Sequence, residues 1–173
     1  MGETERKASQ AIDNQRAVLA EEIVARQYER QPALWRPYGD TGRDLSVRDA
    51  GYHLAYLSEA LAAADPTLFA DYVQWVKVLF AGLGFPEDVL PTTLECTREV
   101  LASRLAAAEA AVATRYLAAG LELLPGVQAT VPSFVEPEAP LAELANQYLE
   151  KLLQGQRHEA SQLILETVAR GGS

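Results

Sequence analysis

Four polar side chains, Ser46, Asp49, His53 and Tyr56, recur at steps of three and four residues, and Tyr52 lies beside them. In a helix these steps place side chains on one face. A carboxylate, an imidazole and two phenols on one face can exchange hydrogen bonds with one another or with nearby loops, as buried polar groups must. They can equally line a pocket for a flat apolar ligand with polar edges. The pattern leaves both interpretations open.

The helix that carries this polar stripe is expected to begin at Asp44, as its N-cap, and to end near Ala64. A neighbouring face of the same helix is apolar and is expected to face the core. That face holds Val47, Ala50, Leu54, Leu57 and Leu61. The polar stripe is therefore predicted to lie beside the core on a largely buried helix.

A second helix is expected to start at Asp65-Pro66, where an N-cap acid precedes a proline at the first helical position, and to end at Gly82. Its aromatic and aliphatic stripe consists of Leu68, Tyr72, Trp75 and Leu79. Such a stripe is more typical of a core than of a ligand wall. Trp35, in the preceding bend, could cover the mouth of a pocket or pack across the bend.

Composition and charge exclude several classes of protein. The net charge of −9 leaves no basic patch for nucleic acid. No apolar run is long enough to span a bilayer, and the charged N-terminus lacks a signal peptide, so a cytoplasmic protein is expected. One cysteine and two histidines allow neither a disulfide framework nor an ordinary zinc site. Without a metal set, a phosphate loop or a nucleophile–base arrangement, we do not expect an enzyme.

Helical periodicity broken by proline and glycine predicts an all-α fold. Residues 1–124 are expected to form one domain, with its first helix at about 10–30, a helix around Pro91 and an Ala-rich helix that ends at Leu124. Residues 125–140 have the composition of a proline-rich linker. Residues 141–173 predict a helical hairpin that is too small to bury a core alone. The hairpin must dock on the main domain, form a homodimer or continue into a further module.

The segment Arg48–Leu54, with the sequence RDAGYHL, resembles the chromophore helix of phycobiliproteins, where Arg-Asp is followed by Gly-Tyr-Tyr-Leu. Further resemblances follow in the same order along residues 11–124. They comprise Gln31-Pro32-Ala33-Leu34, Asp71-Tyr72-Val73, Leu83-Gly84-Phe85-Pro86 and the helix Ala110–Leu124 with Tyr116. The resemblance implies a globin-like, phycobiliprotein-like helical domain that binds a linear tetrapyrrole.

The resemblance also implies roles for individual side chains. Asp49 would accept hydrogen bonds from the inner pyrrole N–H groups. Arg48 would pair with one propionate of the chromophore, because a guanidinium matches a carboxylate in shape, and Arg43 could take the other. Tyr72 would line the pocket. His53 could donate to a ring carbonyl.

The remaining candidates for the binding site are aromatic. Tyr52 and His53 stand where the family has two adjacent tyrosines, Tyr56 continues the polar stripe, and Trp75 follows Tyr72 by three residues. We predict that these side chains form the wall of the chromophore site, although the stripe that contains Trp75 is also typical of a core.

The attachment cysteine of the family, two residues before Arg-Asp, is replaced by Ser46. Serine cannot form the thioether, so we expect non-covalent binding, with biliverdin as the expected chromophore. Cys96, the one cysteine of the sequence, is the only candidate for attachment of the chromophore, and free cysteines are most often buried structural residues. Reversible binding, with an N-terminus shorter than the helical pair that the family uses for subunit pairing, favours a photosensory domain in signal transduction over light harvesting.

Two alternatives remain at this stage. Haem could bind through His53, although the Arg-Asp pair has less purpose where the ring nitrogens already bind iron. The chain could also be a ligand-free interaction module that uses its acidic surface and helical tail. Residues 141–165 resemble the first helices of the subdomain that precedes cobalamin-binding domains, which implies a downstream output module in a longer photoreceptor. We expect no cobalamin binding by this chain.

Overall fold

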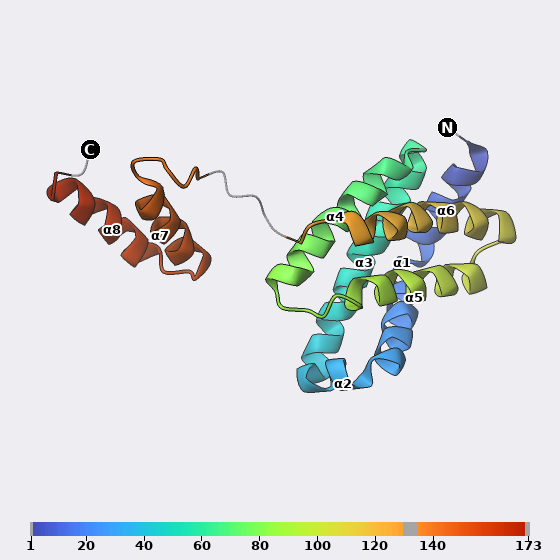
Figure 1. Ribbon diagram of the computed structural model, residues 1–173. Helices are drawn as coiled ribbons and strands as arrows, with labels where there is room; N and C mark the ends of the chain where they lie inside the picture. The colour runs from blue at the N-terminus through green and yellow to red at the C-terminus, as the bar shows by residue number, and fades with distance from the viewer. Residues whose placement is uncertain (1, 130–134, 172–173) are drawn as a thin grey trace. The chain divides into compact units, whose positions relative to one another are not determined.

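The computed structural model describes residues 2–129 and 135–171, and in these residues helix follows helix without a strand, as the sequence predicts (Figure 1). The helices are α1 (Glu3–Arg30), α2 (Pro32–Trp35), α3 (Gly39–Ala63), α4 (Pro66–Gly82), α5 (Val89–Arg104), α6 (Ala107–Leu123), α7 (Ala142–Leu153) and α8 (Arg157–Ala169), with short 3₁₀ turns η1 (Arg36–Tyr38) and η2 (Leu124–Gly126). The chain divides into two compact units, residues 1–130 and 131–173.

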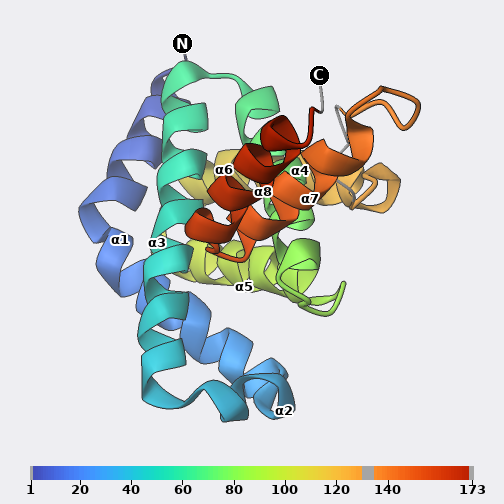
Figure 2. The same ribbon diagram turned by 90° about the vertical axis from the view of Figure 1, so that its left-hand side faces the viewer.

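The first unit is organised around the long helices α1 and α3, which lie side by side in Figure 2. Helix α6 packs against α4, and α5 packs against α1 and α6. The largest fully buried side chains come from all five of these helices and include Ile12, Leu19, Ile23, Leu54, Leu57, Leu61, Phe69, Leu94, Leu101 and Leu117. Burial of this continuous aliphatic core is the main term that holds the five helices together.

Helix boundaries follow the local chemistry. The predicted cap at Asp65 is confirmed, because its Oδ1 accepts from the backbone N–H of Thr67 at 2.9 Å, and Pro66 opens α4. Two starts were predicted too late: α1 begins at Glu3 and α3 begins at Gly39. Both added segments are polar, so they carry no apolar periodicity to mark them as helix.

The expectation that the apolar stripe of α4 faces the core is wrong. Leu68, Trp75 and Leu79 are 49%, 58% and 39% exposed, so their stripe is surface and not core. The face that packs inward carries Phe69, Ala70, Val73 and Val76. Helix α4 is apolar around most of its circumference, and periodicity cannot tell which of two apolar faces finds a partner.

The second unit contains the helical hairpin formed by α7 and α8. Gly155 adopts a φ of +76° in the turn between them, a conformation that favours glycine. Only Ala142 and Ala160 are buried in the two helices, and Leu153 is 88% exposed. The described part of this unit therefore buries little apolar surface of its own.

Candidate functional site

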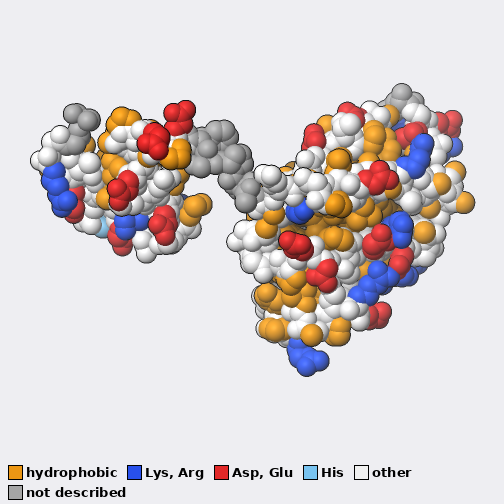
Figure 3. All heavy atoms as spheres, viewed as in Figure 1, with side chains coloured by type: hydrophobic (Ala, Val, Ile, Leu, Met, Phe, Trp, Pro, Cys, Tyr) orange, Lys and Arg blue, Asp and Glu red, His pale blue; other side chains and the backbone are white. Residues whose placement is uncertain are grey.

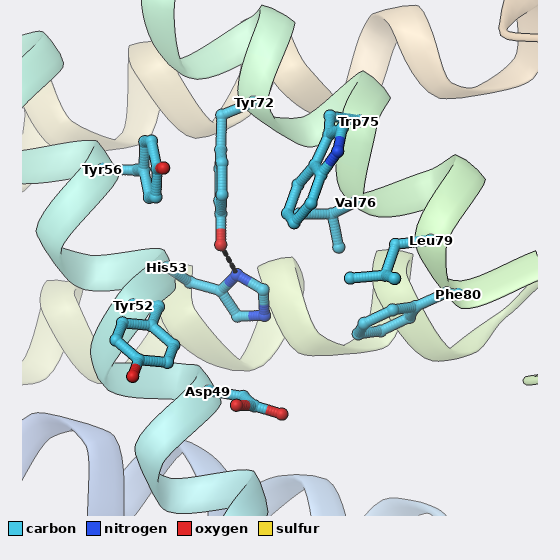
Figure 4. A pocket seen from close by; sticks show the side chains of 9 residues that line it. All are labelled: Asp49, Tyr52, His53, Tyr56, Tyr72, Trp75, Val76, Leu79 and Phe80. Atoms are coloured by element: carbon cyan, nitrogen blue, oxygen red, sulfur yellow. Dashed lines mark hydrogen bonds between the residues drawn. The ribbon is translucent and has the colours of Figure 1, made fainter. Parts of the chain in front are cut away.

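A cavity of about 380 Å³ opens between α3 and α4 (Figure 4). It is lined by Asp49, Tyr52, His53, Tyr56, Tyr72, Trp75, Val76, Leu79 and Phe80. Six of the eight residues singled out from the sequence are among them, and Arg43 and Arg48 are not. Val76, Leu79 and Phe80 were not foreseen as lining, although they follow Tyr72 and Trp75 at helical steps.

The periodicity of both helices explains why these side chains meet. Residues 49, 52, 53 and 56 share one face of α3, and residues 72, 75, 76, 79 and 80 share one face of α4. The Asp65 cap ends the turn after Ala64, whose φ of +54° reverses the chain, and α3 and α4 then pack against each other. The turn brings the polar side of α3 opposite the aromatic side of α4.

His53 is the buried polar group of the cavity, with 7% of its surface exposed. Its Nδ1 lies 2.7 Å from the hydroxyl oxygen of Tyr72. Burial lowers the pKa of His53 to about 4, so its imidazole is neutral at physiological pH. Burial, followed by the nearby Tyr56 and Asp49, raises the pKa of Tyr72, which stays a neutral phenol. The two side chains form a neutral, hydrogen-bonded pair that joins α3 to α4.

Aromatic rings form one wall of the cavity. The ring of Tyr72 stacks on Tyr56 with centroids 3.8 Å apart, and Trp75 lies on its other side at 6.1 Å. Tyr52, Tyr56 and Trp75 are each more than half exposed. Of the polar stripe residues that line the cavity, only His53 is buried. The prediction that the stripe lies on a largely buried helix is therefore wrong for the others. The aromatic surface is open to a ligand.

Neither arginine proposed for the propionates lines the cavity. Arg43 donates to Glu21 of α1 at 2.7 Å. Arg48 Nε lies 3.6 Å from Asp49 Oδ1, and both of these side chains are more than half exposed. Asp49 is thus the one charged residue among the cavity's lining residues, with Arg48 beside it at the surface.

The two possible attachment positions lie outside the cavity. Ser46 Oγ donates to the backbone oxygen of Gly42 at 2.9 Å and lies 3.4 Å from the hydroxyl of Tyr28. Cys96 is fully buried in α5 among the core residues, and burial raises the pKa of its thiol. A thiol that is buried and protonated is a poor nucleophile.

Trp35 packs across the bend and does not cover the cavity. It is buried, and its ring stacks on Tyr28 with centroids 5.2 Å apart and contacts Phe85 at 6.0 Å. Of the two roles considered for Trp35, the structure supports the structural one.

Hydrophobic side chains also surface between α5 and α6 in Figure 3. A smaller hollow of about 180 Å³ at this side is lined by Leu90, Pro91, Leu124 and Pro125, with Lys77 and Glu87. Lys77 already donates to the backbone oxygen of Leu124 at the end of α6. None of the candidate binding residues lines this hollow, so the cavity between α3 and α4 is the better candidate site.

Comparisons with known proteins identify the family of the chain. The sequence model of the family described as "Phycobilisome protein" matches residues 2–154. "Allophycocyanin subunit beta-18" of Porphyra purpurea is 30% identical over 104 residues, which are 57% of this chain and 62% of that protein. The match thus spans less than two thirds of that relative.

The chain belongs to the phycobilisome protein family. Its all-helical first unit has the globin-like phycobiliprotein fold that the sequence predicts. The family match also extends beyond residue 124, where the resemblance was expected to end, and includes α7. The expected resemblance of the tail to cobalamin-binding proteins stays a prediction.

Proposed function

We propose that this protein binds a linear tetrapyrrole, biliverdin in the first instance, in the cavity between α3 and α4 without a covalent bond. The observation that carries the proposal is the cavity itself: it joins the Asp49 carboxylate and the buried His53 to a wall of aromatic rings on a chain of the phycobilisome protein family. This combination matches a flat, conjugated ligand with N–H and C=O groups along its edge.

The donor set suits such a ligand. The carboxylate of Asp49 can accept from tetrapyrrole N–H groups, and the exposed faces of Tyr52, Tyr56 and Trp75 can cover its apolar surface. Because no cation lines the cavity, the propionates belong outside it. Arg48, with an exposed side chain next to Asp49, can turn to meet one of them.

The two possible attachment positions support the proposal of non-covalent binding. Ser46 lacks a thiol, and Cys96 is buried away from the cavity. Reversible retention favours a photosensory role in signal transduction over a permanent pigment carrier. Within that proposal, the hairpin of α7 and α8 passes the signal on, through a homodimer or through a downstream module such as a cobalamin-binding domain. No helix within residues 2–129 and 135–171 is long and apolar enough to cross a membrane.

An absorption titration with biliverdin and with phycocyanobilin tests the proposal. Binding should sharpen the long-wavelength band and shift it to the red, and denaturation should release the pigment completely. Asp49→Ala should change the spectrum strongly, whereas Asp71→Ala, an exposed acid on α4 outside the cavity, should not. Unchanged spectra with both bilins, or pigment that stays on the denatured chain, would contradict the proposal.

Haem is a second candidate because a neutral, buried histidine lies in the cavity. A neutral imidazole nitrogen is an axial ligand to haem iron in many proteins. If haem is the ligand, a Soret band should survive purification of the wild type and disappear in His53→Ala. A protein that shows no pigment binding and loses its oligomeric state when residues 140–173 are removed would instead be a ligand-free interaction module.

A further inference from the structure

Helix α4 connects the cavity with the end of α6. Figure 4 shows Val76 and Phe80 among the side chains of α4 that line the cavity. Lys77 follows Val76 directly but does not line the cavity, because successive residues of a helix are rotated by about 100°. Its Nζ instead donates to the backbone oxygen of Leu124. Neighbouring residues of α4 therefore contact the cavity and the end of α6.

The Leu124 oxygen lies where the chain leaves α6 and continues towards the second unit. It accepts from Lys77 and also from the backbone N–H of Val127, at 3.3 Å. The last carbonyl groups of a helix lack donors within the helix and carry partial negative charge, so a lysine ammonium stabilises them. Lys77 is partly buried and makes no other hydrogen bond with the described residues. This one bond thus ties α4 to the start of the connection between the units.

Phe80 is a second contact between the same two regions. It lines the cavity, where its ring contacts that of His53 edge-on with centroids 6.4 Å apart. It also lines a separate small hollow of about 50 Å³, together with Lys77 and with Ala129 near the end of the first unit. Packed side chains leave little free space, so a displacement of the Phe80 ring on one side affects its contacts on the other.

We propose that α4 couples the cavity to residues 124–129 through the Lys77 hydrogen bond and the ring of Phe80, so that a ligand in the cavity holds this segment more firmly. The coupling rests on the proposed function and supplies the first step by which binding is passed towards the second unit. A ligand packed against Val76 and Phe80 binds best when α4 keeps the position in which the Lys77 bond is formed. Coupling between two sites is reciprocal, so this bond strengthens ligand binding by the same factor.

The hold on residues 124–129 can be measured without a ligand, by amide hydrogen exchange with mass spectrometry. Lys77→Met keeps a long side chain but loses the donor, and it should speed exchange of the peptide that contains Val127 by about 5–10-fold, the effect of one charged hydrogen bond. Lys7→Met removes the same charge from an exposed ion pair with Glu3 and should leave this exchange unchanged. Equal exchange in Lys77→Met and the wild type would overturn the hold by Lys77.

Two alanine variants test the contact through Phe80. Phe80→Ala should speed exchange of residues 124–129, whereas Leu79→Ala, which changes a residue of the cavity but not of the small hollow, should not. The α1 peptide around the fully buried Leu19 reports global unfolding and should exchange as in the wild type. If that peptide also exchanges faster, the smaller change Phe80→Leu takes the place of Phe80→Ala. Equal effects of the Phe80 and Leu79 variants would overturn the contact through Phe80.

Biliverdin tests the coupling itself. Saturating biliverdin should slow exchange of residues 124–129 in the wild type by about 5-fold, and Lys77→Met should bind biliverdin more weakly by the same factor. Lys7→Met should bind biliverdin as the wild type does. A wild type that binds biliverdin with no change in this exchange would overturn the coupling and leave the proposed function intact. Failure to bind biliverdin or phycocyanobilin would overturn the proposed function and the ligand coupling with it, whereas exchange in the unliganded chain would still decide the hold by Lys77.

Discussion

The rings of Tyr56 and Tyr72 stack with centroids 3.8 Å apart and planes 11° apart, and they come from the two different helices that line the cavity. The stack makes the wall of the cavity a surface shared by α3 and α4. Tyr56 and Trp75 keep more than half of their surface exposed at its edges. That exposed aromatic surface is what a flat ligand would cover.

Ligand binding should therefore protect these rings from solvent. In hydroxyl-radical footprinting with mass spectrometry, biliverdin should reduce oxidation of Tyr56 and Trp75 several-fold. Tyr38 is a matched control, because its 51% exposure is close to the 53% of Tyr56 and it does not line the cavity. Equal protection of Tyr38 and Tyr56, or none at either, would place the ligand elsewhere.

The two arginines should differ in their contribution to binding. Arg48 lies beside Asp49, which lines the cavity, whereas Arg43 is paired with Glu21 of α1. Exposed ion pairs contribute up to about 1 kcal/mol, so Arg48→Ala should weaken biliverdin binding by about 2–5-fold and Arg43→Ala should leave it unchanged. Biliverdin dimethyl ester, which lacks the propionate charges, should bind the wild type and Arg48→Ala equally. A loss confined to Arg43→Ala would reverse this assignment.

Local spacing was sufficient to predict the helix α3, the Asp65 cap and the polar stripe with Asp49 and His53, because each depends on residues within one or two helical turns. Local spacing could not predict the partner of Arg43, since Glu21 lies on another helix, 22 residues away in the sequence. The exposure of Leu68 and Leu79 on α4 could not be predicted for the same reason: only tertiary packing decides which apolar face of α4 is covered.

The candidate site could also be predicted only in part. Spacing placed the polar stripe on one face of a helix, but the hydrogen bond between His53 and Tyr72 is a contact between two helices. The resemblance to phycobiliproteins, and not the periodicity, linked the stripe to tetrapyrroles. Residues such as Leu79 and Phe80, which line the cavity, carry no chemical signal that separates them from ordinary core residues.

Two helical glycines should respond in opposite ways to alanine. A Cβ at Gly51 in α3 would meet nothing within 4 Å, so Gly51→Ala should raise the free energy of unfolding by about 0.5–1 kcal/mol. A Cβ at Gly120 in α6 would lie 3.0 Å from Val73 Cγ2, where α4 and α6 pack closely. Gly120→Ala should therefore lose this gain or destabilise the fold.

Urea unfolding of the two variants measures the difference. The double variant Gly120→Ala with Val73→Ala removes the clashing methyl groups and should be less destabilised than the sum of the single changes. If Gly120→Ala were as stabilising as Gly51→Ala, the close approach of α4 and α6 would not limit the packing.

Stability should depend on pH through His53. The pKa of a histidine is 6.5 in the unfolded chain and about 4 for buried His53, so the unfolded chain binds more protons between these values. The free energy of unfolding should therefore fall as the pH falls from 6.5 to about 4, by up to about 3 kcal/mol, and His53 should add no further loss below pH 4.

Urea unfolding at pH 7 and pH ~4.5 tests this dependence. The decrease in the free energy of unfolding between the two pH values should be smaller in His53→Gln than in the wild type. His158→Gln, which changes an exposed histidine, should retain the wild-type decrease. An identical decrease in the wild type and His53→Gln would mean that His53 is protonated in the folded chain as readily as in the unfolded one, and that burial does not lower its pKa.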